Sequence, residues 1–190
     1  MVLLIRWAAF AASALSVFAS ASAAEKRYGL TSFEAIELTA DVIVEVVTRA
    51  PVGAVATGTP AALDRLTVET RDGRLVIGQR QFAGDDTRRE PLGQVTVRIN
   101  AANVRSATVV GGGSLRIDTL KGTRVNIGLR GPGRLTVGAI TTDRLSVTMI
   151  GNGSMTLAGS AKTAQMSLSG AGTLDAGGLL GPHIKPLAER

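Results

Sequence analysis

Cysteine is absent from the 190-residue chain, which excludes disulfides, thiolate metal ligands, a cysteine nucleophile and lipid attachment through cysteine. Aromatic residues are scarce, and beyond residue 23 they are Tyr28, Phe33 and Phe82. The core must therefore be built from aliphatic side chains. The single histidine, His183, has no second histidine or cysteine with which to share a metal ion, and no Ser-His-Asp pattern surrounds it.

Carboxylates are also sparse in the second half of the chain, where residues 91–181 contain Asp118, Asp143 and Asp175. Glycoside hydrolysis usually needs two carboxyl groups about 5–10 Å apart, whereas Asp118 and Asp143 fall at different positions of the repeat described below. A calcium site needs several oxygen ligands, and no Gly-Lys-Ser/Thr signature of a nucleotide loop occurs. We therefore predict no catalytic residues, no metal and no cofactor.

The first residues have the composition of an export signal. Arg6 precedes an uncharged apolar run, 7–18, and Ala21-Ser22-Ala23 fits a signal-peptidase site. We predict a signal peptide over 1–23, with export to the periplasm or the cell surface. No later segment is long and apolar enough to span a membrane as a helix, so no transmembrane segment is expected after cleavage.

Glycine pairs recur along the second half of the chain at steps of 20, 20 and 19 residues. Apolar residues alternate with period two on both sides of each pair, which predicts two half-buried strands joined at a glycine corner. A fixed period of about 20 residues is typical of a solenoid, and the register extends upstream to Gly93. The paired corner glycines are Gly111 and Gly113, Gly131 and Gly133, Gly151 and Gly153, and Gly170 and Gly172.

These patterns predict an all-β fold in a single solenoid domain over 24–181, with coils of about 20 residues. N-terminal strands are expected within 33–78 and Gly-x-Gly coils within 91–180. Asp72-Gly73 predicts a hairpin turn, and 51–60 is expected to be a loop. A second corner is expected in each coil at Gly122, Thr142 and Lys162. The tail, 182–190, is predicted to be irregular.

The chain resembles the bacterial head GIN domain family, DUF2807, an autotransporter-adhesin head domain. The resemblance rests on Phe33, on the segments ADVIVEV, LDRLTVETRDGRLVI and VTVRI, and on the repeated GxGxLxV units, and it covers about 28–180. It implies a right-handed β-helix-like stack of strands in an exported or envelope protein, with no catalytic residues to carry over. Family members usually continue through about one more coil, whereas this chain stops near Pro182–Pro186.

Basic residues favour an acidic partner. Arg124 and Arg144 occupy the same position in successive coils, with Arg105 nearby, and such a stripe could meet an acidic polysaccharide or the phosphates of lipopolysaccharide. The alternative is a solvated face that keeps the sheet soluble. Nucleic acid is disfavoured because the chain is predicted to be exported and the repeats lack aromatic residues for base stacking.

We predict a non-enzymatic binding or structural module of the bacterial cell envelope, with adhesion as one role. One alternative is a periplasmic domain that self-associates or docks a partner strand through an open C-terminal edge. A polysaccharide-active enzyme is the other alternative.

Overall fold

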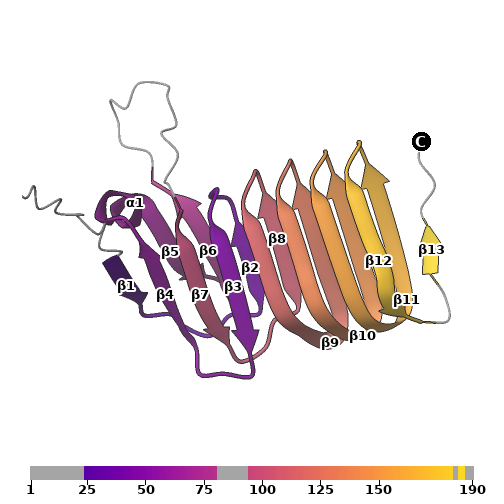
Figure 1. Cartoon of the computed structure of the whole chain (residues 1–190). Helices are drawn as coiled ribbons and strands as arrows, with labels where there is room; N and C mark the ends of the chain where they lie inside the picture. Colours follow the sequence, from indigo (N-terminus) through magenta and orange to yellow (C-terminus); the bar gives the residue numbers. More distant parts are fainter. Residues whose placement is uncertain (1–23, 81–93, 182–183, 187–190) are drawn as a thin grey trace, which may run out of the picture.

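The computed structural model describes residues 24–80, 94–181 and 184–186. Thirteen strands in these ranges form one sheet that folds around a single aliphatic core, accompanied by one short helix (Figure 1). The fold is therefore all-β, as predicted. The proposed signal peptide, Gly93 and part of the tail lie outside the described residues.

The N-terminal elements are short. They are β1 (Ala24–Tyr28), β2 (Ala35–Leu38), β3 (Ile43–Thr48), β4 (Gly53–Gly58), α1 (Pro60–Arg65), β5 (Leu66–Arg71), β6 (Arg74–Gln79), β7 (Thr96–Ala101) and β8 (Ser106–Val110). Three long strands follow, and two short strands end the sheet. These are β9 (Ser114–Arg130), β10 (Arg134–Ile150), β11 (Ser154–Ser169), β12 (Thr173–Leu180) and β13 (Ile184–Pro186).

The long strands β9, β10 and β11 lie parallel and are offset by one repeat. Arg134 pairs with both Ser114 and Ser154, so the 20-residue spacing in the sequence equals the spacing between paired residues. Each long strand is continuous but bends midway (Figure 1). In β9 the period-two burial pattern breaks at this bend, because Ile117 and Leu120 are both buried although they are three residues apart. The predicted second corner is thus a bend within one strand.

The two glycines of each corner serve different purposes. The first has positive φ, at 104° in Gly111 and 108° in Gly131, a conformation that side chains other than glycine rarely adopt. The second has ordinary φ but no room for a side chain, because a Cβ on Gly153 would lie 2.4 Å from the carbonyl oxygen of Gly133. The second glycine therefore allows neighbouring corners to stack.

The strand that lies beside β9 differs from the one that the repeat spacing predicts. The upstream register placed residues 94–97 directly beside β9, but β3 lies between β7 and β9. Ile43 pairs with Thr96 on one side and Ser114 on the other. Asp41, in the turn between β2 and β3, accepts a hydrogen bond from the backbone nitrogen of Gly112 at 2.8 Å. The β3 strand, from the N-terminal part of the domain, is thus the neighbour of β9.

Two local predictions have opposite outcomes. The hairpin at Asp72-Gly73 is confirmed, since both residues have positive φ and join antiparallel β5 and β6. The predicted loop over 51–60 is wrong, because β4 occupies most of it and pairs with β1 and β7. Its buried residues are small, Ala54 and Ala56, and such residues give little strand signal.

The prediction that 182–190 is irregular is wrong for the part of the tail that the structure describes. Residues 184–186 form β13, which pairs in parallel with Ala164–Met166 of β11. The physical reason lies in the preceding strand, because β12 covers β11 only over Ser154–Ser160 and leaves the outer edge of the second half of β11 open, while its other edge pairs with β10. The β13 strand provides backbone hydrogen-bonding partners for three residues of that outer edge.

The core is aliphatic, as the composition requires. Its largest fully buried side chains include Ile36, Leu75, Leu115, Leu135 and Met149. Phe33 is the aromatic residue among the buried side chains of the described ranges, and it lies two residues before β2. Close-packed strands leave a narrow interior that suits such side chains.

Candidate binding site

Charge is divided unequally between the two halves of the described chain. Residues 24–80 contain seven Lys and Arg against eight Asp and Glu, whereas residues 94–181 contain nine Lys and Arg against three Asp. The excess positive charge therefore lies on the long strands and their neighbours. Any electrostatic attraction for an acidic partner is concentrated there.

Arginines of the N-terminal strands are mostly paired with glutamates. Arg74 lies 2.7 Å from Glu37, and Arg98 lies 3.3 Å from Glu45. Arg98 also lines a hollow of about 900 Å³ over β1, β4 and β7. Tyr28 borders this hollow, and burial, with a smaller effect of Asp64, raises the pKa of its hydroxyl. Because its charges are compensated, this hollow has no net preference for an anion.

A second hollow, of about 470 Å³, lies over the second halves of β9, β10 and β11. We call it the arginine groove and define it by six polar residues that line it. They are Arg124, Asn126, Arg144, Ser146, Thr163 and Gln165. All six side chains are exposed, and none forms an ion pair with a carboxylate in the described part of the chain.

Strand register arranges these residues in two parallel rows. Arg124, Arg144 and Thr163 are direct partners across the three strands. Asn126, Ser146 and Gln165 form the second row, two residues further along. Neighbouring strands are about 4.8 Å apart, so the two guanidinium groups can converge on one ligand group. The inward-facing Leu145 and Ala164 between the rows are buried and hold the spacing.

The predicted stripe of three arginines is therefore two arginines. Arg124 and Arg144 stack as expected, but the guanidinium group of Arg105 forms an ion pair with Glu34. Its aliphatic part runs across Gly122, where a Cβ would lie 3.0 Å from the Arg105 Cδ. Arg105 does not line the groove.

The second row was missed by the sequence reasoning, although a signal for it exists. Asn126, Ser146 and Gln165 follow one another at intervals of 20 and 19 residues, the same intervals as the corner glycines. Polar residues at such positions are expected on any solvated strand face. Only the structure shows that these three residues line the same hollow as Arg124 and Arg144.

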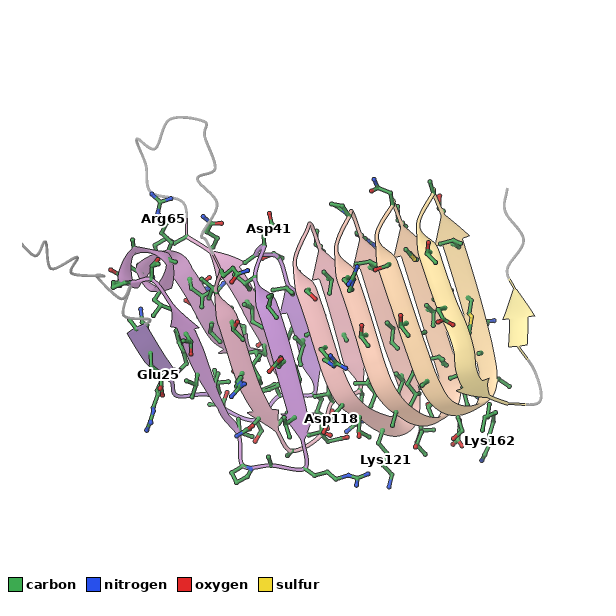
Figure 2. The ribbon with its side chains drawn as sticks, viewed as in Figure 1. Glu25, Asp41, Arg65, Asp118, Lys121 and Lys162 are labelled. Carbon is green, nitrogen blue, oxygen red and sulfur yellow. The ribbon has the colours of Figure 1, made fainter. Side chains whose placement is uncertain are left out.

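Two carboxylates of the long strands contact neighbouring strands. The Asp118 side chain accepts hydrogen bonds from the backbone nitrogen and the hydroxyl of Thr48, at 3.0 and 2.8 Å, and so joins β9 to β3. Asp143 lies 2.7 Å from the ammonium group of Lys162. Figure 2 places Asp118 and Lys162 at the bend of the long strands, on the side opposite Asp41. The two aspartates therefore have separate structural partners.

The described residues place no three histidine, aspartate or glutamate side chains together as metal ligands. Across the same ranges, no helix has the length and apolar character needed to cross a membrane. The six groove residues offer hydrogen-bonding groups, and the two arginines among them add positive charge.

Folds of this class occur in several solved bacterial structures. A putative adhesin from Bacteroides fragilis is 18% identical, with a TM-score of 0.76 over 88% of this chain and 76% of that one. A putative lipid binding protein from Parabacteroides distasonis is 16% identical, with a TM-score of 0.64 over 86% and 77% of the two chains. A putative adhesin from Parabacteroides merdae is 17% identical, with a TM-score of 0.62 over 86% and 76%.

The family model described as "Putative auto-transporter adhesin, head GIN domain" (DUF2807) matches residues 32–185. The chain therefore belongs to this family, which confirms the resemblance noted from the sequence. A search of curated proteins gives no match.

Proposed function

We propose that the protein is an exported, non-catalytic binding module of the bacterial cell envelope, built as a right-handed β-helix-like solenoid. In this proposal the arginine groove binds an acidic polysaccharide or lipopolysaccharide. The observation that carries the proposal is the alignment of Arg124 and Arg144 in a hollow without a carboxylate. The adhesin and lipid-binding names of similar proteins agree with a binding role, and the 20-residue strand offset supports the solenoid.

The test is binding of purified protein to lipopolysaccharide and to an acidic polysaccharide, measured by titration calorimetry at low salt. Arg124→Ala with Arg144→Ala is expected to weaken binding at least tenfold, since a charge-assisted hydrogen bond contributes about 1.5–3 kcal/mol. Arg130→Ala with Arg134→Ala is the matched control, because it removes the same charge from long-strand ends outside the groove. An equal loss in both double variants would contradict a defined site and indicate net charge alone.

A second role, self-association through the C-terminal edge, is favoured by a specific observation. The β12 strand contains one charged residue, Asp175, and ends at Leu180, which is 73% exposed. No described strand pairs with its outer edge, and uncharged open edges recruit other strands. The β13 strand pairs with three residues of β11 and not with β12, so it leaves the outer edge of β12 open.

Sedimentation velocity over a hundredfold concentration range tests this second role. Self-association is expected to raise the mean sedimentation coefficient, and Leu180→Lys is expected to abolish the rise by placing a charge at the edge. Ile150→Lys is the control, because Ile150 is 44% exposed but lies on β10. A monomer at every concentration would exclude association through β12.

A further inference from the structure

The chemical groups in the first row of the arginine groove favour one kind of anion. Each guanidinium presents a planar fork of N–H donors and no acceptor. Thr163 occupies the third position of the row, and its hydroxyl donates a hydrogen bond to the backbone carbonyl of Asp143 at 3.1 Å. The row thus offers two forks and two positive charges, with no carboxylate among the described groove residues to share them.

A carboxylate and a phosphomonoester use such a row differently. A carboxylate has two oxygens and one negative charge, which a single fork satisfies. A phosphomonoester carries about 1.5 to 2 negative charges near neutral pH and has three acceptor oxygens. Because Arg124 and Arg144 are in direct register about 4.8 Å apart, both can contact the same phosphoryl group.

The second row suits the group that carries the phosphate. Asn126, Ser146 and Gln165 each provide both donors and acceptors. Sugar hydroxyls also donate and accept, so they can pair with this row while the phosphate contacts the first. The rows are two residues apart along the same strands, a separation of about 6.6 Å, which is comparable with the width of one sugar ring.

We infer that the arginine groove selects a phosphomonoester on a sugar, with the phosphate between Arg124 and Arg144 and the sugar hydroxyls on Asn126, Ser146 and Gln165. This inference rests on the proposed function, since it specifies the acidic ligand of the same site. It distinguishes phosphorylated glycans from those whose acidity comes from uronic acids.

The test compares phosphorylated dextran with carboxymethyl dextran of equal charge per residue, with unmodified dextran as the uncharged reference. The wild-type protein is expected to bind the phosphorylated polymer at least tenfold more tightly than the carboxymethyl polymer. Arg124→Lys with Arg144→Lys keeps the charge but removes both forks, and it is expected to reduce the preference to threefold or less. Circular dichroism of both proteins checks that the sheet is retained.

The outcomes separate this inference from the function on which it rests. Equal affinity for the two charged polymers would overturn phosphate selection and leave acidic-glycan binding intact, whereas failure to bind either would overturn both. An unchanged preference in the double-lysine variant would overturn the role of the forks. Lipopolysaccharide before and after phosphatase treatment then identifies the source. Loss of binding on treatment assigns the phosphate to a glycolipid, and failure to bind untreated lipopolysaccharide assigns it to a polysaccharide. Binding that survives removal of the phosphate would overturn phosphate selection.

Discussion

Gly153→Ala is expected to destabilise the protein by about 3 kcal/mol or more, at the upper end of the range for overpacking substitutions. The added Cβ would lie 2.4 Å from the carbonyl oxygen of Gly133 and 2.8 Å from that of Gly131. Both obstructing atoms belong to the backbone of the neighbouring corner, so no side-chain rotation relieves the contact. Relief requires separation of stacked strands, which breaks their hydrogen bonds. Urea denaturation followed by circular dichroism measures the loss.

Gly53→Ala is the control for this prediction. Gly53 begins β4, has no positive φ, and a Cβ there would meet no atom within 4 Å. Alanine is therefore expected to be neutral or to stabilise by up to about 1 kcal/mol, by reducing the freedom of the unfolded chain. A Gly153→Ala midpoint equal to that of Gly53→Ala would show that the corners can separate without cost.

The sequence predicts the long strands well because their determinants are local. Corner glycines, period-two alternation and the 20-residue interval all lie within one unit, and equivalent units stack in register. Gly111 illustrates this, since its positive φ follows from its place at a corner. The hairpin at Asp72-Gly73 is equally local.

Other features depend on contacts between residues distant in the sequence, and the sequence pattern does not contain them. The β3 strand has the same alternation whether it lies at an end of the sheet or between β7 and β9. Arg105 has the spacing of a groove residue, but its partner is Glu34, 71 positions away. Repeat spacing therefore identifies Arg124 and Arg144, and only the fold excludes Arg105.

A crosslinking prediction distinguishes a sheet in which β3 lies beside β9 from one in which β7 does. Glu45 of β3 is the direct partner of Arg116 on β9, so Glu45→Cys with Arg116→Cys is expected to form a disulfide almost completely under mild oxidation. Direct partners on adjacent strands have Cα atoms about 5 Å apart, within the range that a disulfide spans. Because the native chain has no cysteine, any change in non-reducing gel mobility or free thiol content reports this pair alone.

Thr96→Cys with Arg116→Cys is the matched control, and it represents the uninterrupted 20-residue register. Thr96 pairs with Ile43, and β3 separates it from β9. Two strand spacings amount to about 9.6 Å, beyond the 7 Å limit for bridging Cα atoms, so the control is expected to keep both thiols free. Crosslinking in the control but not in the test pair would show that β7 stacks directly on β9. The expected result would establish that the first long strand, β9, pairs with β3 from the N-terminal region. Its partner residues then lie more than 60 positions upstream in the sequence.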